Sequence, residues 1–309
     1  MRNPSFDAAR LQIFQRGWLS SNNVLFEGGG EKDEAVLIDS GYCTHAPQTV
    51  ALVREALGAR KLDRIVNTHL HSDHCGGNHA LQLAFGCRID VPAGEAGKVD
   101  RWDESQLTFR DTGQQCPPFR RTGSIRDGDE IECGARSWKV ISAPGHDPES
   151  IVLYQPVLEI LISADALWEN GFGVVFPELE GRQAFDDVRR TLNRLADLRV
   201  KWVIPGHGAP FQGLESAVGR AHRRLDGFVS DPARHSRHAA KVLIKFHLLE
   251  VQRRSLSELL EWLEATKFMR LSHIEYFKAT EFRSWCLTLL EELAKSKAIA
   301  IDDQLIRNI

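Results

Sequence analysis

The sequence predicts an α/β protein in two parts: a layered domain over residues 1–212 and a mostly helical module over residues 213–309. In the first part, short apolar runs typical of strands alternate with segments whose apolar residues recur at helical spacing. This alternation is typical of a domain in which helices cover β-sheets. From about Phe211 onward the helical spacing is nearly continuous, so the architecture is expected to change there.

The predicted strands of the first part are bounded by turn-forming residues. β-forming residues occur between 11 and 26 and are followed by the glycines at 28–30, which indicate a turn. The apolar run 35–39 ends in Asp39. Further strands are expected to begin at 65 and to occupy 87–91, 130–133, 137–141, 151–154 and 159–162.

Helices are predicted where apolar residues recur on one face. In the first part these segments are 48–57, 76–85, 94–103 and 182–198, and in the second part 214–228, 232–250, 255–268 and 280–296. Ser255 and Glu258 have the spacing of a capping box at a helix start. Residues 111–121 indicate a loop near the mouth of a cleft, and residues 298–306 indicate two short closing strands.

The composition is that of an ordinary soluble globular protein. Hydrophobic residues make up 42% and charged residues 26% of the 309 residues, and the formal net charge is −3. No overall field therefore favours nucleic acid or a membrane as partner. We expect a cytoplasmic protein, because the sequence shows neither a signal peptide nor a membrane span. The six cysteines lack CxxC spacing, which disfavours a disulfide framework or a zinc ribbon.

Three histidines and an aspartate lie close together between a predicted strand and a pair of glycines. They are His69, His71, Asp73 and His74 in the segment 68–78. Imidazole nitrogen and carboxylate oxygen are ligands that suit zinc. At this spacing in a loop, two histidines can face one ion while the aspartate and the last histidine turn towards another. Without a metal, these polar groups would compete for hydrogen bonds at a strand end.

The HxHxDH pattern of these residues resembles the signature loop of the metallo-β-lactamase-fold superfamily. The resemblance implies an αββα four-layer sandwich and further ligands on later loops. Three segments resemble the remaining motifs: 143–147 with His146, 160–165 ending in Asp165, and 203–208 with His207. Glycines beside the two histidines allow the tight turns that these motifs need.

The resemblance implies two metal ions, expected to be Zn²⁺ with iron or manganese as alternatives. His69, His71 and His146 would hold one ion, Asp73, His74 and His207 the other, and Asp165 would bridge them. A hydroxide between the ions would attack the substrate, and Asp73 is the catalytic candidate that orients it or moves its proton. Asp39 could steady a ligand imidazole, although a turn-forming role fits it equally well.

The resemblance implies a hydrolase for an ester, thioester or lactone bond of a small acyl substrate. Asp165 stands where most zinc β-lactamases have cysteine, and His71 where the flavodiiron branch has glutamate. The pattern is therefore closer to glyoxalase II and the lactonase-like hydrolases, although none of the three tyrosines lies where quorum-signal lactonases have one. The candidates for an apolar pocket wall are Trp168, Asn170 and Phe172.

Two other activities remain open. A phosphodiesterase or ribonuclease could use the same metal pair, and residues 214–309 carry 16 Lys and Arg against 13 Asp and Glu. That excess could bind an anionic partner such as nucleic acid, but we favour a solvated helix surface. A sulfur dioxygenase, as in the persulfide-oxidising branch of the superfamily, would use a single iron. The C-terminal helices and hairpin resemble the winged-helix module of some members, and such a module suits a homodimer.

Overall fold

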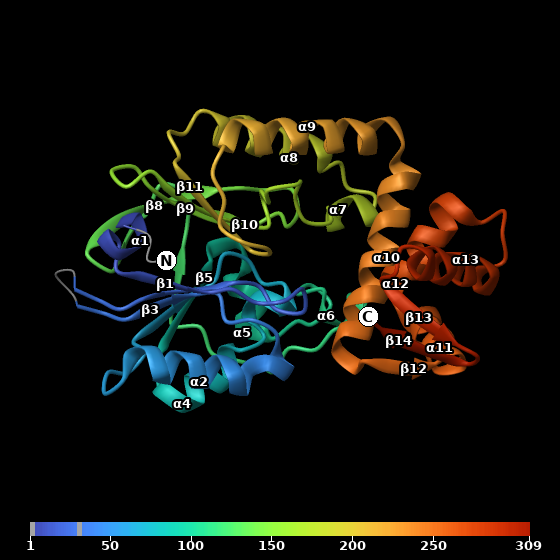
Figure 1. The fold of residues 1–309 in the computed structure, drawn as a ribbon, viewed down its shortest axis with the longest axis horizontal. Helices are drawn as coiled ribbons and strands as arrows, with labels where there is room; N and C mark the ends of the chain where they lie inside the picture. Colours follow the sequence, from blue (N-terminus) through green and yellow to red (C-terminus); the bar gives the residue numbers. More distant parts are fainter. Residues whose placement is uncertain (1–3, 30–32) are drawn as a thin grey trace.

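Two β-sheets packed face to face form the centre of the fold, and helices cover both outer surfaces (Figure 1). The computed structural model describes residues 4–29 and 33–309. The first sheet has the strand order β1-β2-β3-β4-β5-β6, and the second has the order β11-β10-β9-β8-β7. This is the αββα sandwich that the resemblance implied, so the predicted fold class is confirmed.

The strands are short, and the two sheets differ in direction. The first sheet consists of β1 Leu11–Phe14, β2 Asn23–Phe26, β3 Val36–Ile38, β4 Arg64–Val66, β5 Arg88–Pro92 and β6 Gly123–Ile125. The second consists of β7 Glu130–Cys133, β8 Arg136–Ser142, β9 Ile151–Gln155, β10 Ile160–Ala164 and β11 Trp202–Pro205. Strands β3 to β6 pair in parallel, as do β10 and β11.

Side chains of the first sheet point alternately to its two faces. Leu25, Leu37, Ile65 and Ile89 are aligned across four strands and pack on the helical side. Their neighbours, among them Val36, face the second sheet. Because both faces are covered, β3 carries apolar residues on both of them rather than alternating with polar ones, as parallel strands usually do.

Helices lie on the outside of both sheets. The first sheet carries α2 Ala46–Leu57, α4 Asn78–Phe85 and α5 Ala96–Arg101, and the second carries α8 Phe185–Ala196 and α9 Leu214–Ser230. Shorter helices are α1 Pro4–Ala8, α3 Ser72–Cys75, α6 Phe109–Thr112 and α7 Phe176–Leu179. In α8, Val188, Leu192 and Leu195 are buried, at the spacing that predicted this helix.

Helix α9 packs as part of the outer layer of the second sheet. Ala217, Ala221 and Leu225 belong to the same hydrophobic cluster as Leu192 of α8 and Val203 of β11. The next helix, α10, contributes instead to a separate cluster. The boundary that we expect between residues 212 and 213 stays a prediction, and the change of packing partner comes one helix later.

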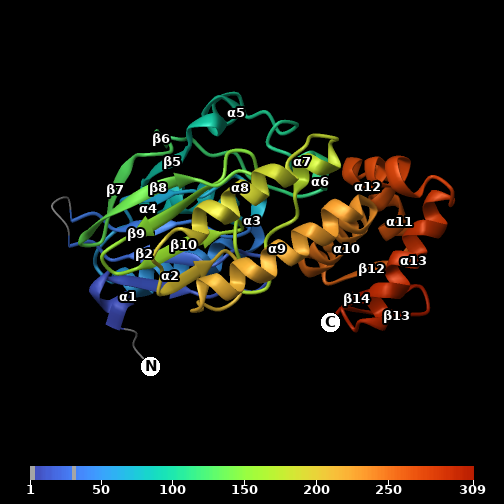
Figure 2. The ribbon, with the colours of Figure 1, turned by 90° about the horizontal axis from the view of Figure 1, so that it is seen from above.

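The C-terminal elements form a compact group at one end of the sandwich, orange to red in Figure 2. They are α10 Pro232–Val251, β12 Arg253–Ser255, α11 Leu256–Ala265, α12 Lys267–Ser272, the π-helical turn η3 His273–Phe277, α13 Phe282–Lys295, β13 Ile299–Asp302 and β14 Leu305–Asn308. Strand β14 lies between β12 and β13 in an antiparallel sheet. The helix predicted over 255–268 is interrupted at Thr266, whose backbone is extended.

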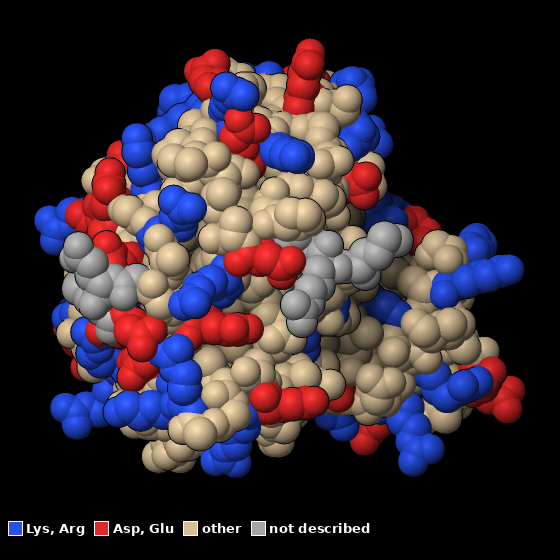
Figure 3. Space-filling model, turned by 60° about the vertical axis from the view of Figure 1, so that its left-hand side comes forward, with Lys and Arg blue, Asp and Glu red and all other residues tan. Residues whose placement is uncertain are grey.

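Several short elements were not predicted, among them β6, β12 and α7. Strands β6 and β12 are three residues long and show no period in the sequence. At β6, Gly123 packs so close to β5 that a Cβ would overlap the Asp90 carboxylate. Among the described helices, none combines the length and apolar character needed to span a bilayer. On the face shown in Figure 3, acidic and basic side chains are interspersed.

The capping box predicted at Ser255 is present at the start of α11. The Glu258 carboxylate accepts a hydrogen bond from the Ser255 N–H at 3.0 Å, and Ser255 Oγ accepts one from the Glu258 N–H. We expect Ser255→Ala to lower the free energy of unfolding by about 1 kcal/mol, because a helix N–H loses its acceptor. Denaturant titration followed by circular dichroism measures this change. The exposed Ser257→Ala is the control, with an expected change below about 0.5 kcal/mol; equal losses would contradict the assignment.

Candidate metal centre

The loop after β4 delivers four polar side chains to the edge where the two sheets meet. Helix α3 is a single turn in which the N–H of His74 donates to His71 O at 2.9 Å. Gly77 then packs so closely against the preceding loop that a Cβ would overlap Ser40 O. This close approach explains why a Gly-Gly pair follows the ligand residues, since any side chain at Gly77 would push the loop out of place.

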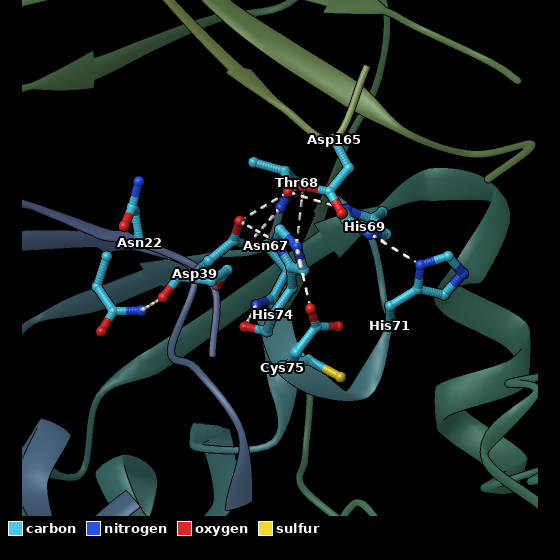
Figure 4. A network of polar contacts seen from close by, with 12 residues as sticks. Asn22, Asp39, Asn67, Thr68, His69, His71, His74, Cys75 and Asp165 are labelled. Atoms are coloured by element: carbon cyan, nitrogen blue, oxygen red, sulfur yellow. Dashed lines mark hydrogen bonds and ion pairs between the residues drawn. The ribbon is translucent and has the colours of Figure 1, made fainter. Parts of the chain in front are cut away.

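The other predicted ligands follow strands of the second sheet. His146 comes after β8, Asp165 directly after β10, and His207 after β11. Because β10 and β11 run parallel, their carboxyl ends bring Asp165 and His207 to the same edge. Between them, a Cβ at Gly206 would overlap Asp165 Oδ1, so glycine is required there. Figure 4 shows Asp165 approaching the loop of the first sheet from the opposite side.

The seven predicted ligands form two groups whose ligand atoms converge. The groups are His69, His71 and His146, and Asp73, His74, Asp165 and His207; within each, one ligand atom per residue lies within 4.8 Å of the others. In the first group, His71 Nδ1 is 3.1 Å from His69 Nε2 and 2.7 Å from His146 Nε2. In the second, Asp73 Oδ2 is 3.0 Å from His207 Nε2.

Asp165 lies between the two groups. Its Oδ2 is 3.4 Å from His146 Nε2 and 3.8 Å from His207 Nε2, while its Oδ1 is 3.5 Å from His74 Nε2. The indole N–H of Trp168 donates to the same Oδ1 at 3.1 Å. One carboxylate therefore faces ligand nitrogens of both groups, which is the position expected of a bridging ligand.

Ring nitrogens of the first group lie close together, with His71 Nδ1 within reach of both His69 Nε2 and His146 Nε2. His146 Nδ1 lies 2.5 Å from Val174 O and must donate to it, so Nε2 of the neutral ring carries a lone pair directed at His71. Burial lowers the pKa of both His71 and His146 to about 4, which keeps the rings neutral. Neutral imidazole nitrogens that converge within 4.8 Å of one another can act together as metal ligands, so these residues fit a metal ion.

The second group attracts positive charge. Burial opposes a charge on His74, but the carboxylates of Asp165, Asp39 and Asp73 raise its pKa well above the usual value. Its Nε2 is buried and has no hydrogen-bond partner among the described residues. A divalent cation at this nitrogen would supply the positive charge that the surrounding carboxylates require. The second group therefore also fits a metal ion.

Asp39 holds the metal loop from behind. Its Oδ1 accepts from the Thr68 N–H at 2.9 Å, and its Oδ2 accepts from the Thr68 hydroxyl at 2.7 Å and lies 2.7 Å from His74 Nδ1. This contact makes Nδ1 the protonated nitrogen of His74 and leaves Nε2 free to bind a cation. The structure thus places Asp39 where the sequence expected a residue that steadies a ligand imidazole.

The two ligand groups lie at the wall of a cavity of about 700 Å³. Trp168 and Asn170, both expected in a pocket wall, line this cavity. Phe172 does not: it is 1% exposed and packs edge-to-face against Phe228 in the core. A bridge between Trp168 and Gly171 turns the loop back on itself, and the next side chain points inward. The expectation for Phe172 as an acyl-facing residue is therefore corrected.

Several cavity residues were missed in the sequence. Trp18 is 58% exposed and stacks on the His207 ring, with centroids 5.3 Å apart. Phe176 meets His71 edge-to-face at 4.9 Å. Val242 and Phe246 of α10 form an apolar part of the wall. Trp18 sits in a loop without any period, and the spacing of the α10 residues shows an apolar face but not what that face contacts.

The first 207 residues contain a match to a known family. The model of the metallo-beta-lactamase superfamily matches residues 16–207. The match covers more than half of the chain and ends at the last predicted ligand. The chain belongs to this superfamily.

Curated relatives carry the name hydroxyacylglutathione hydrolase. The protein of Brucella anthropi is 31% identical over 205 residues, which are 62% of this chain and 66% of the relative. That of Methylococcus capsulatus is 29% identical over 192 residues, which are 61% and 62% of the two chains. The chain thus spans less than two thirds of the length of these relatives.

Solved structures share the fold over almost the whole chain. A metallo-beta-lactamase family protein from Thermus thermophilus is 20% identical with a TM-score of 0.57, covering 97% of this chain and 99% of that chain. A beta-lactamase domain protein from Burkholderia ambifaria is 20% identical with a TM-score of 0.58, covering 96% and 90%. At this identity the likeness establishes the fold, including its C-terminal part.

The contact of Asp39 with His74 predicts a change in metal affinity. We expect Asp39→Asn to weaken zinc binding by about 10–100-fold, because the amide cannot accept the His74 Nδ1–H as a carboxylate does. Competition with a chromophoric chelator measures the affinity. The control is Asp90→Asn, which removes the carboxylate paired with Arg64 in the same sheet. If both variants lose metal equally, general destabilisation would explain the effect and the positioning role of Asp39 would fail.

Proposed function

We propose that this chain is a metal-dependent hydrolase that cleaves a thioester, ester or lactone bond of a small acyl substrate with two zinc ions bound. The observation that carries the proposal is the meeting of two ligand groups around Asp165 at the wall of one large cavity. The superfamily membership supports a hydrolase, and the name of the curated relatives favours a thioester as the first bond to test.

Each ligand group would hold one ion, with Asp165 shared between them. The nitrogen and oxygen donors suit zinc, and iron or manganese would find the same donors acceptable. A pair of bound divalent cations supplies Lewis-acid chemistry, lowering the pKa of water and polarising a carbonyl.

The protein's own groups would place and move the proton of the attacking water. Asp73 lines the cavity, and its Oδ2 is 3.0 Å from His207 Nε2. Burial alone would raise its pKa, but His74 and His207 lower it below the usual value, so Asp73 is ionised and able to accept a hydrogen bond from water. The indole N–H of Trp168 holds Asp165 in orientation. We assign Asp73 the role of orienting water and carrying its proton.

The cavity wall supports a substrate with an apolar acyl part. Phe176, Val242, Phe246 and Leu249 contribute apolar surface next to the ligand groups. Such a wall excludes water from the reacting carbonyl and buries an acyl chain.

The other activities have less support. Basic residues of α10 are committed within the protein: Arg237 and Lys241 pair with Glu292, and Lys245 donates to Ala298 O at 2.6 Å. They are therefore poorly available to a nucleic acid or other phosphodiester. A sulfur dioxygenase needs one iron, whereas seven converging donors favour a pair of ions.

The remaining expectations are kept as proposals. The antiparallel sheet β12-β14-β13 next to α11 and α13 supports a winged-helix-like module after residue 212. We also propose a cytoplasmic location and a homodimer, for the reasons given in the sequence analysis.

Loss of a ligand should abolish activity. We expect the zinc-loaded protein to hydrolyse acyl thioesters and His69→Ala to lower kcat/KM at least about 100-fold, since the carbonyl loses its Lewis acid. Thiol release followed with a disulfide dye measures the rate. His222→Ala on α9 is the control, because His222 does not line the cavity. No turnover of thioesters, esters or lactones by the wild-type chain would refute the hydrolase.

Metal content tests the number of ions directly. We expect two zinc ions per chain in the wild-type protein and about one in His207→Ala, because only the second group loses a donor. Elemental analysis after dialysis gives the ratio, and circular dichroism checks the fold. One iron per chain in the wild type would favour the dioxygenase instead.

A further inference from the structure

A half-buried arginine without an anionic partner lies in the wall of the same cavity. Arg224 of α9 lines the cavity together with Asp73 and Asp165. Among the described residues it forms no ion pair, and its Nε is buried without a hydrogen-bond partner. A partly desolvated cation without a counter-charge is a favourable partner for an anionic group of a ligand.

The other cations of the wall are already used. Lys241 pairs with Glu292 at 3.2 Å, and Lys245 donates to Asn308 Oδ1 at 2.5 Å. Within the part of the chain that the structure describes, the side chain of Arg224 donates to His238, whose Nε2 lies 2.7 Å from Nη2. Burial, Arg224 and Lys241 lower the pKa of His238 to about 4, so the neutral ring accepts from Arg224 and adds no negative charge.

The guanidinium is held in a fixed orientation. It lies 5.7 Å from the Phe172 ring centre and 5.4 Å from that of Phe228, so two aromatic rings support it. It also covers Gly171, where a Cβ would approach Arg224 Cδ at 2.9 Å. Because the loop is pinned in this way, Arg224 presents a pre-oriented donor set rather than a mobile surface charge.

Arg224 also lies close to the proposed reacting centre. Gly171, against which it packs, bridges to Trp168, and Trp168 donates to the Asp165 carboxylate. Gly173 in the same loop packs so tightly against His146 that a Cβ would overlap its ring. Arg224 and the ligand groups therefore line one cavity and are connected through a single loop.

We propose that the substrate carries a carboxylate besides its scissile bond, and that Arg224 binds this carboxylate while the carbonyl lies at the two ligand groups. The inference rests on the proposed function and specifies its substrate. Arg224 is a specificity residue: the cavity accepts an apolar acyl compound with one anionic end. The carboxylate can belong to the acyl part or to the leaving thiol.

Three thioesters test this assignment on the zinc-loaded protein: a neutral one, butyryl N-acetylcysteamine; one with the carboxylate on the acyl part, succinyl N-acetylcysteamine; and one with the carboxylate on the thiol, butyryl 3-mercaptopropionate. We expect one of the charged compounds to have a KM about 10–100-fold below that of the neutral one, from charge-assisted hydrogen bonding to the guanidinium. Arg224→Gln should remove this advantage in KM while leaving kcat and the neutral substrate nearly unchanged. Arg224→Lys should restore part of it.

Arg223→Gln is the matched control, since Arg223 is the exposed neighbour of Arg224 on α9 and does not line the cavity. It should leave the preference intact. If Arg224→Gln lowers kcat/KM of neutral and charged thioesters alike, Arg224 is structural and the proposal is overturned. An equal KM for all three compounds in the wild type overturns it as well.

Binding of non-hydrolysable thioethers of the same three shapes separates this proposal from the hydrolase itself. By calorimetry, tighter binding of a charged thioether that is lost in Arg224→Gln supports the carboxylate site even if no thioester is turned over, in which case only the hydrolase fails. Turnover of the thioesters without any charge preference leaves the hydrolase standing and removes the carboxylate site. No binding of any thioether by the wild type counts against the carboxylate site.

Discussion

The carboxylates around the buried His74 ring set the constraint on which the site depends. Asp39, Asp73 and Asp165 approach this one ring, and its Nε2 accepts no hydrogen bond from any residue that the structure describes. Negative charge held away from water is unfavourable unless positive charge lies beside it. In the protein without metal, a proton on His74 supplies part of that charge; a divalent ion supplies more. The arrangement therefore favours cation binding before any substrate is present.

The sandwich makes this arrangement a property of the whole fold. The loop after β4 belongs to the first sheet, whereas Asp165 and His207 end strands of the second. Metal ions held by both sets would connect the two sheets at one edge. Binding of metal and packing of the inter-sheet core, which includes Trp138 against Phe26, are consequently coupled. A substitution between the sheets can weaken the site without touching a ligand.

The sequence predicted those parts of the structure that are local along the chain. Helix α8 and the capping box at Ser255 were predicted because side-chain spacing or short-range hydrogen bonds define them. The site residues were predicted from an HxHxDH loop and three strand-end motifs, each of which is also local. Trp18 and Phe172 are two residues whose positions local patterns in the sequence do not predict. Whether Trp18 stacks on a histidine, or Phe172 points inward, depends on contacts between distant segments, which no local pattern contains.

The contacts within the C-terminal elements show what several of their basic residues do, which the count of Lys and Arg could not. Arg237 and Lys241 share Glu292 of α13, and Lys245 holds the end of the chain through Ala298 O and Asn308. These cations stabilise the packing of α10 against the last elements. Arg224 differs because its surroundings are two phenylalanines and a neutral histidine. The ligand groups follow the superfamily pattern, whereas this wall is made by α9 and α10, outside the segment that the family model matches. Under the proposed function, selectivity for one acyl compound over another would reside in the helices, and the bond-breaking groups would reside in the strand-end loops.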